Sequence, residues 1–122
     1  AYEMPKKSDE EKAARAAAVE AATLHASLVP LTVMKEAYKV FELLEEMTAK
    51  GNPNSVTDGA VGVLAVRACI QGAFLNVKIN VKGLKDRAKA EELLISAQGI
   101  DEAAAAIQNE IITRVVTQLA IE

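Results

Sequence analysis

The chain has 122 residues, of which 51% are apolar and only 3% aromatic, and its net charge is −3. This length fits a single domain over residues 1–122, with a core built from Ala, Val, Leu and Ile because the chain has no Trp. The acidic net charge and the lack of a basic cluster argue against nucleic acid as a partner, and a lone cysteine excludes an internal disulfide.

The sequence also bears on localisation. No apolar run approaches the roughly 18 residues that a transmembrane helix needs, and the first residues, AYEMPKKSDEEK, are too polar for a signal peptide. We therefore expect a cytoplasmic protein without a membrane partner.

The first predicted helix runs from about residue 8 to Val29. Ser8 and Glu11 form a capping-box pattern at its start, and the alanine runs that follow have high helix propensity. Pro30 is expected to end or kink this helix, because proline lacks the N–H that a helix interior uses.

A second predicted helix starts at Pro30, since proline suits the first turn of a helix. Apolar residues recur at helical spacing from Leu31 to Phe41, and Gly51 after Lys50 is a good C-terminal stop.

A polar segment, Gly51–Asp58, then joins this helix to a third one. Ser55 and Asp58 repeat the capping-box spacing with Asp in place of Glu, so the third helix is expected to start near Val56 and to continue to about Lys82.

Asp86 opens the last predicted helix, in which Gly99 and Asp101 form a weak point that could split it. No segment alternates as a half-buried strand does. The pattern predicts an all-α protein, an antiparallel bundle of about four helices with short loops.

The third helix carries a stripe of small residues with polar ends. At heptad spacing the stripe contains Asp58, Gly62, Ala65, Cys69, Gly72 and Asn76. Small residues let another helix approach closely, so the stripe predicts a packing seam with the same chain or with a partner subunit. Cys69 is expected to pack there as a small apolar residue.

Asn76 and Asn80 lie one turn apart on one face of an otherwise apolar stretch. A buried carboxamide must be hydrogen-bonded, because an unpaired one costs a few kcal/mol. The pair therefore indicates either an interhelical hydrogen-bond network or a polar ligand, and residue type alone does not separate the two.

Other polar residues have a structural and a functional interpretation. Asp58 suits a helix N-terminus as a negative charge, and the polar neighbours Asn52, Asn54 and Ser55 are common in loops. His25 has no partner at metal-ligand spacing, so no metal site is expected. Five cations lie around the junction of the third and last helices and could receive an anionic ligand tail, but a solvated helix face is the better interpretation. These cations are Lys78, Lys82, Lys85, Arg87 and Lys89.

The segment GNPNSVTDGAVGVLAVRACIQGAFLNVKINVKGLKD resembles the formiminotetrahydrofolate cyclodeaminase and methenyltetrahydrofolate cyclohydrolase family. Members carry a GNPNSVSD-like loop, here Gly51–Asp58, followed by a helix that ends in GAxxNVxIN, here Gly72–Asn80. The opening AYEMPK is similar to the family's AYxLPK segment, and Val29-Pro30-Leu31 matches its VPL. A Gly- and Ser-rich segment normally precedes AYxLPK in the family, so we expect the domain to be incomplete at its N-terminus.

The resemblance implies an all-α, commonly homodimeric enzyme that acts on the one-carbon unit of tetrahydrofolate, with no metal and no cofactor beyond tetrahydrofolate as the substrate carrier. In the cyclodeaminase, a lyase, N10 attacks the formimino carbon and ammonia leaves to give 5,10-methenyltetrahydrofolate. In the cyclohydrolase, a hydrolase, water opens 5,10-methenyltetrahydrofolate to 10-formyltetrahydrofolate. The cyclodeaminase is the first expectation and the cyclohydrolase the alternative, while a non-catalytic helical dimerisation module is an alternative of another class.

Side-chain chemistry assigns roles within the resembling segment. Asp58, the only carboxylate of the loop, is the candidate catalytic residue, for proton transfer or for the pterin's amino-pyrimidine edge. The candidate substrate-binding residues are Asn52, Asn54, Ser55, Asn76 and Asn80. In a continuous helix Asp58 and Asn76 lie about 27 Å apart. They serve either opposite ends of an elongated folate or, as we favour, one site formed across an antiparallel dimer interface.

Overall fold

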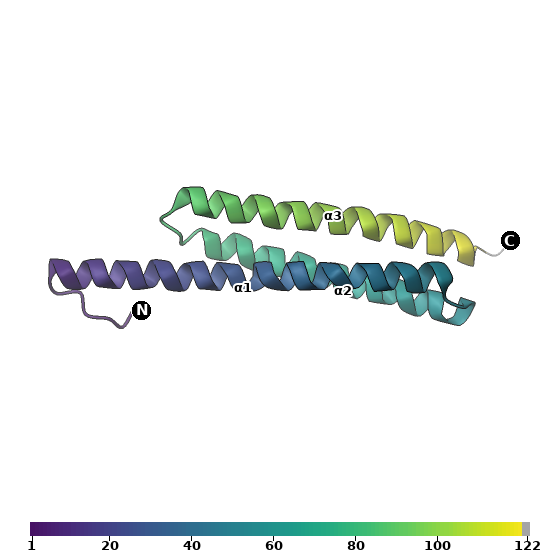
Figure 1. Cartoon of the computed structure of the whole chain (residues 1–122), viewed down its shortest axis with the longest axis horizontal. Coiled ribbons are helices and arrows are strands. Elements are labelled where there is room, and N and C mark those ends of the chain that lie inside the picture. Colours follow the sequence, from purple (N-terminus) through teal and green to yellow (C-terminus); the bar gives the residue numbers. More distant parts are fainter. Residues whose placement is uncertain (121–122) are drawn as a thin grey trace.

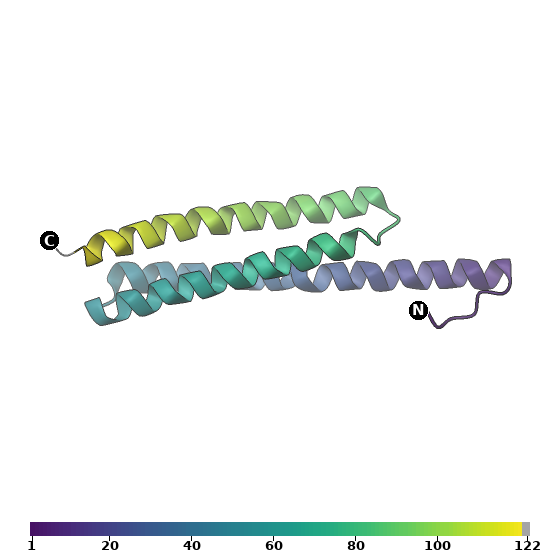
Figure 2. The same ribbon diagram turned by 180° about the vertical axis from the view of Figure 1, so that it is seen from behind.

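Three long helices form the described part of the chain, and each runs antiparallel to the one before it (Figures 1 and 2). The computed structural model describes residues 1–120. It contains α1 (Asp9–Lys50), α2 (Pro53–Val81) and α3 (Arg87–Leu119), and no strand among the described residues. The all-α class is confirmed, whereas the expectation of four helices is wrong.

The helix count differs because α1, a helix of 42 residues, continues through Pro30 without a break. A proline within a helix leaves the carbonyl four residues earlier without its N–H donor. Here that carbonyl belongs to Ala26, and it accepts a hydrogen bond from Nδ2 of Asn80 in α2 at 2.9 Å. Pro30 itself is buried in the bundle. Tertiary contacts thus supply what the proline removes, and the helix does not end.

The start of α2 is also earlier than the sequence pattern predicts. Pro53 occupies the first turn and Asn52 is the N-cap, so the expected start near Val56 with a Ser55–Asp58 capping box is wrong. Asn followed by Pro is itself a good helix start, because the carboxamide accepts free N–H groups and proline has no N–H to satisfy. Gly51 ends α1 as predicted.

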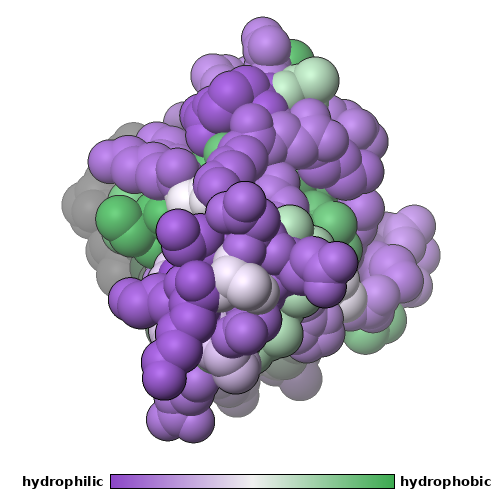
Figure 3. Space-filling view, turned by 90° about the vertical axis from the view of Figure 1, so that its left-hand side faces the viewer, coloured by the Kyte–Doolittle hydropathy of each residue, from purple (hydrophilic) through white to green (hydrophobic). Residues whose placement is uncertain are grey.

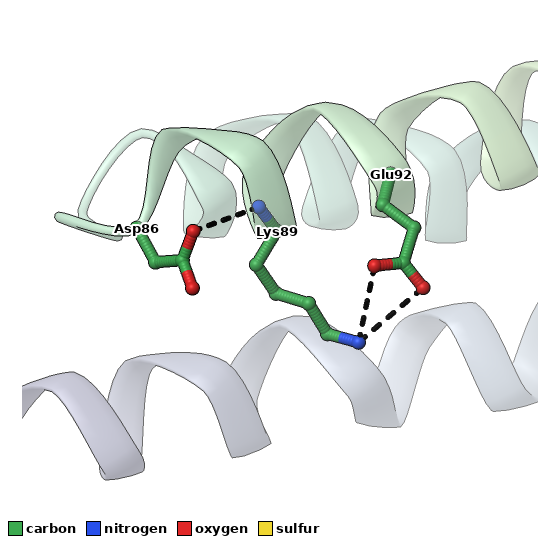
Figure 4. Close-up of polar contacts among 3 residues, drawn as sticks. All are labelled: Asp86, Lys89 and Glu92. Carbon is green, nitrogen blue, oxygen red and sulfur yellow. Dashed lines mark hydrogen bonds and ion pairs between the residues drawn. The ribbon is translucent and has the colours of Figure 1, made fainter.

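The last helix is continuous from Arg87, and Gly99 does not split it. Asp86 caps it as predicted, accepting a hydrogen bond from the backbone N–H of Lys89 at 3.0 Å, while Nζ of Lys89 reaches Glu92 (Figure 4). Asp101 is not a breaking residue, because its carboxylate pairs with Arg67 of α2.

The core runs along the shared seam of the three helices and contains mainly aliphatic side chains, as the composition predicts. Its largest fully buried members are Phe41, Met34, Ile70 and Ile111. Gly59 and Gly62 let α1 approach α2: a Cβ on Gly62 would lie 2.8 Å from Leu44. The predicted packing seam is therefore filled at this end of the stripe.

The other end of the stripe is open. A Cβ on Gly72 would meet nothing within 4 Å, and Ala65, Cys69 and Asn76 are exposed. The expectation that Cys69 packs as a small core residue is wrong, because this face of α2 lies on the outside of the bundle.

The first helix is longer than its neighbours. Its N-terminal part extends past the α2–α3 connection, and residues 1–8 fold back beside it (Figures 1 and 2). The guanidinium of Arg15 donates two hydrogen bonds of 3.4 Å to the carbonyl oxygen of Tyr2 and lies 5.2 Å from the Tyr2 ring. These contacts fix the N-terminal segment against α1.

Two helices, α1 and α2, are long and apolar enough to cross a membrane by length and composition alone. This corrects the expectation that no such stretch exists. The core helices of soluble proteins pass the same test, and the tested stretches of α1 and α2 contribute buried residues to the bundle.

Candidate functional site

The polar loop residues lie at the end of the bundle where α1 passes into α2. Oδ1 of Asn52 accepts hydrogen bonds from the backbone N–H groups of Asn54, at 2.9 Å, and Ser55, at 3.0 Å. The hydroxyl of Ser55 donates to the carbonyl oxygen of Asn52. Both side chains are therefore engaged in capping α2, whereas the side chain of Asn54 is exposed to solvent.

Asp58 projects from the second turn of α2 and is exposed. Its carboxylate makes no hydrogen bond or ion pair with the described residues 1–120. The structural role that its spacing suggested, a capping carboxylate, is taken by Asn52 instead. A free, solvent-accessible carboxylate at this position is available to a ligand or to a partner.

An apolar groove between α1 and α2 holds the two asparagines. We call it the α1–α2 groove; its volume is about 620 Å³, and it is lined by Ala26, Val29, Pro30, Val33, Ala68, Cys69, Gly72, Ala73, Asn76 and Asn80. Asn76 and Asn80 provide carboxamides at one side of a surface that is otherwise built from small and aliphatic groups. Small-molecule sites commonly combine a mostly apolar lining with a few polar groups, so this groove is a candidate ligand site.

The two asparagines differ in what they contact. Asn80 is half-buried and donates to the carbonyl oxygen of Ala26, so it belongs to the interhelical network. Asn76 is exposed, and its carboxamide has no hydrogen-bond partner among residues 1–120. The network interpretation thus holds for Asn80, and Asn76 is the carboxamide free to bind a ligand.

The structure does not bring Asp58 and Asn76 together within one chain. Because α2 is continuous from Pro53 to Val81, the 18 residues between them span about 27 Å. Both residues are exposed and lie at opposite ends of the small-residue stripe, which is packed against α1 at Gly62 and open at Gly72. A single reacting centre cannot use both residues of one chain.

The fold also gathers cations that the sequence did not show to be close. Lys6, Lys12 and Arg15 from the N-terminal region meet Lys85 from the α2–α3 connection around a cavity of about 460 Å³. They are up to 79 residues apart in sequence (85 − 6), so no local pattern could reveal them. The expectation that the chain has no basic cluster is corrected here.

A carboxylate, Glu20, also lines this cavity. Its oxygens accept hydrogen bonds from the backbone N–H groups of Lys85, at 2.8 Å, and Asp86, at 3.0 Å. These two hydrogen bonds lower the pKa of Glu20 below its ordinary value, because they favour the charged form. Glu20 ties α1 to the start of α3.

Metal ligation finds no support in the described part of the chain. Residues 1–120 contain no group of three or more His, Cys, Asp or Glu side chains that could hold an ion. His25 is exposed on α1.

The chain is similar to proteins of known families. The family model described as formiminotransferase-cyclodeaminase matches residues 1–99. A methenyltetrahydrofolate cyclohydrolase of Methylorubrum extorquens is 44% identical over 111 residues, which cover 91% of this chain and 53% of that protein.

More distant relatives carry a different name. The formimidoyltransferase-cyclodeaminases of Sus scrofa and Mus musculus are 33% and 31% identical, over 72% and 70% of this chain and 16% of their own length. The chain thus spans about half the length of the cyclohydrolase and about a sixth of the two cyclodeaminases.

Proposed function

The chain belongs to the formiminotransferase-cyclodeaminase family, and from this we propose that it serves as all or part of an enzyme of folate one-carbon metabolism, acting as a methenyltetrahydrofolate cyclohydrolase. The similarity to a protein of that name covers 91% of the chain at 44% identity, against 70–72% at 31–33% for the cyclodeaminases. The cyclodeaminase reaction, the first expectation although the motifs do not separate it from the cyclohydrolase, becomes the alternative.

The observation that carries the proposal is the α1–α2 groove with its free carboxamide. A pterin is a flat ring with hydrogen-bonding edges, and the groove offers an apolar surface with Asn76 beside it. A carboxamide can donate to and accept from such an edge at the same time. Asn80 already donates from Nδ2 to the carbonyl oxygen of Ala26, so only the remaining hydrogen-bonding capacity of its carboxamide is available to a ligand.

The two candidate reactions pass through a tetrahedral carbon flanked by nitrogens and both need a proton transfer. We propose Asp58 for that role, because it is exposed and unpaired among the described residues. A carboxylate near the attacking water would accept its proton as the methenyl bridge opens. In the cyclodeaminase reaction the same group would take the proton from N10 as it attacks and pass it to the amino group that leaves as ammonia.

The distance along α2 requires a second chain for this arrangement. In an antiparallel, two-fold pairing of two α2 stripes, Asp58 of one copy would face Asn76 of the other, and the α1–α2 groove beside Gly72 would be enclosed between the copies with the ligand inside it. We therefore propose a homodimer whose site is shared between the copies.

The first test is to incubate the 122-residue chain with 5,10-methenyltetrahydrofolate and with 5-formiminotetrahydrofolate, and to follow binding and turnover together. Opening of the methenyl compound supports the cyclohydrolase, and release of ammonia from the formimino compound supports the alternative. A folded dimer that neither binds nor converts either compound would leave the dimerisation module as the remaining function.

A complementation experiment tests the shared site. Asp58→Asn and Asn76→Ala homodimers should each be inactive, but subunit exchange should restore about a quarter of the wild-type sites, since half of the dimers become mixed and each mixed dimer has one intact site. If mass spectrometry shows that the two variants have exchanged subunits but no activity returns, this result would contradict a site built from two chains.

A further inference from the structure

Gly72 is a helix residue that neither packing nor backbone conformation explains. It lies inside α2, where glycine is less favourable than alanine because it loses more conformational freedom on folding. Gly59 and Gly62, in the same helix, have a packing reason, since a Cβ there would lie 2.7 Å from Thr48 and 2.8 Å from Leu44. A Cβ on Gly72 would meet nothing within 4 Å, and no glycine among residues 1–120 has a positive φ. The fold of a single chain therefore gives Gly72 no structural role.

The place of Gly72 in the α1–α2 groove gives its missing side chain a consequence. Ala68 and Asn76 line the groove four residues before and four residues after Gly72, so the three residues share one face of α2 over about 12 Å. Between the methyl group of Ala68 and the carboxamide of Asn76, the backbone of α2 is uncovered. Val29 and Val33 line the groove from α1. A molecule that enters the groove can therefore contact the α2 backbone at Gly72.

The groove also exposes apolar surface that an occupant would cover. Val29 and Val33 are 49% and 41% exposed, and both line one cavity of about 620 Å³. Figure 3 looks along the bundle from the end where α1 begins, and hydrophilic residues dominate that view. The groove, in contrast, lies between the middle parts of α1 and α2 and is mostly apolar. Removing its walls from water favours an occupant with an apolar face.

The polar group beside Gly72 limits what this occupant can be. The carboxamide of Asn76 has no hydrogen-bond partner among residues 1–120, and it can both donate and accept. A flat ring with polar edge atoms offers an apolar face to the valines and a hydrogen-bonding edge to Asn76. Such a ring can approach the helix backbone more closely over a glycine than over a residue with a Cβ.

We propose that Gly72 is a specificity-determining residue of the α1–α2 groove, where its missing side chain lets a planar heteroaromatic ring lie against the α2 backbone with its edge at Asn76. The identity of this ring as a pterin rests on the proposed function. The steric role of Gly72 is the same for the cyclohydrolase and for the cyclodeaminase reaction, because both act on a pterin compound. A close approach by α2 of a second copy is the competing use of the same space, and the experiment separates the two.

Cys69 reports whether the groove is occupied. It is the only cysteine of the chain, it is exposed, and it lines the same groove. Its alkylation by iodoacetamide, followed by mass spectrometry, should slow when a ligand fills the groove. The probe is 5-formyltetrahydrofolate, which carries the pterin ring but neither the methenyl bridge nor the formimino group of the proposed substrates. p-Aminobenzoylglutamate, which lacks the pterin ring, is titrated in parallel, and neither measurement needs turnover.

The test variant is Gly72→Ala and its matched control is Gly99→Ala. Gly99 is also an exposed helical glycine whose added Cβ would meet nothing within 4 Å, but it lies on α3, outside the groove. Both substitutions should raise the unfolding midpoint, which shows that both variants are folded. The concentration of 5-formyltetrahydrofolate that halves the alkylation rate should rise about tenfold in Gly72→Ala and stay unchanged in Gly99→Ala. p-Aminobenzoylglutamate should protect Cys69 in none of the proteins.

The contrary results separate this proposal from the proposed function. Protection of the wild-type chain with the same affinity in Gly72→Ala would overturn the role of Gly72 and leave the proposed function intact. If 5-formyltetrahydrofolate does not protect the wild-type chain, or if p-aminobenzoylglutamate protects it equally, the ring does not lie in the groove and both proposals lose their site. Sedimentation of the same proteins measures self-association. A dimer that Gly72→Ala weakens by the same factor as ligand affinity would assign the space to the second copy and overturn the ligand contact.

Discussion

Nδ2 of Asn80 donates to the carbonyl oxygen of Ala26 at 2.9 Å, and this is the carbonyl that Pro30 leaves without an N–H donor. One side chain of α2 thus repairs the backbone of α1 at the point where its sequence favours a break. The relationship explains why a proline is tolerated in the middle of a 42-residue helix and why a carboxamide lies beside an apolar groove.

This relationship predicts coupling between Asn80 and Pro30. Asn80→Ala should lower the free energy of unfolding by about 1 kcal/mol, because it removes one partly exposed hydrogen bond. In a Pro30→Ala background the new backbone N–H would serve the Ala26 carbonyl, so the same substitution should have a smaller effect. Urea unfolding of the four proteins in the cycle measures the coupling. Equal effects in both backgrounds would contradict the repair.

A partly buried ion pair joins α2 to α3. Arg67 Nη1 lies 2.6 Å from Asp101 Oδ1, and the two side chains are 13% and 19% exposed. Asp101→Ala should destabilise the protein by about 2–4 kcal/mol, because the guanidinium is left without its partner in a poorly hydrated place. Replacing both residues, as Arg67→Met/Asp101→Leu, should have a smaller effect than Asp101→Ala. Thermal unfolding compares the single and the double variant. If the double variant is as unstable as Asp101→Ala, the loss of stability does not come from leaving the Arg67 guanidinium unpaired.

Two glycines in helices should respond oppositely to alanine. A Cβ on Gly59 would lie 2.7 Å from Cγ2 of Thr48, whose hydroxyl is held by Arg114 at 3.0 Å. Gly59→Ala should therefore destabilise the bundle by about 1–3 kcal/mol. Gly99 has nothing within 4 Å, so Gly99→Ala should stabilise it by about 0.5–1 kcal/mol through helix propensity. The unfolding midpoints of both variants show whether each substitution stabilises or destabilises the protein. Two shifts in the same direction would contradict the difference in packing between Gly59 and Gly99.

The carboxylate of Glu20 should make stability depend on pH. Its pKa is lowered in the folded state by the N–H groups of Lys85 and Asp86, so the folded protein binds this proton less readily than the unfolded chain does. Its stabilising contribution is fully present above the ordinary pKa of a glutamate and is lost as pH falls through the lowered value.

Chemical unfolding from about pH 7 to about pH 3 tests this linkage. The difference in stability between wild type and Glu20→Gln should shrink toward the acid end, because the glutamine is uncharged throughout. Glu36→Gln, on the exposed surface of α1, serves as the control. A wild-type advantage that persists unchanged at the acid end would contradict the assignment.

The sequence predicted the local features well where a short pattern is sufficient. The Ser8 cap, the stop at Gly51 and the Asp86 cap each depend on a few neighbouring residues, and each is confirmed. The loop motif and the GAxxNVxIN ending were enough to indicate the family, which the comparisons confirm.

The sequence misled where a distant residue decides the outcome. Pro30 was expected to end a helix because its missing N–H is visible in the sequence, whereas the compensating carboxamide of Asn80 lies 50 residues away. The start of α2 was misplaced for a different reason: the Ser55–Asp58 pattern was preferred to the stronger Asn52–Pro53 start.

What the sequence determined by itself is the helical class, most helix ends and the family, because helix propensity, capping and family motifs are local properties of the chain. Only the tertiary structure decided which polar groups are used up and which remain free. It pairs the carboxamide of Asn80 with the carbonyl oxygen of Ala26 and leaves Asn76 and Asp58 exposed toward opposite ends of α2. It also brings four cations around one cavity, namely Lys6, Lys12, Arg15 and Lys85. The physical reason is that hydrogen-bond satisfaction and electrostatic potential depend on distances in space, which helix packing sets.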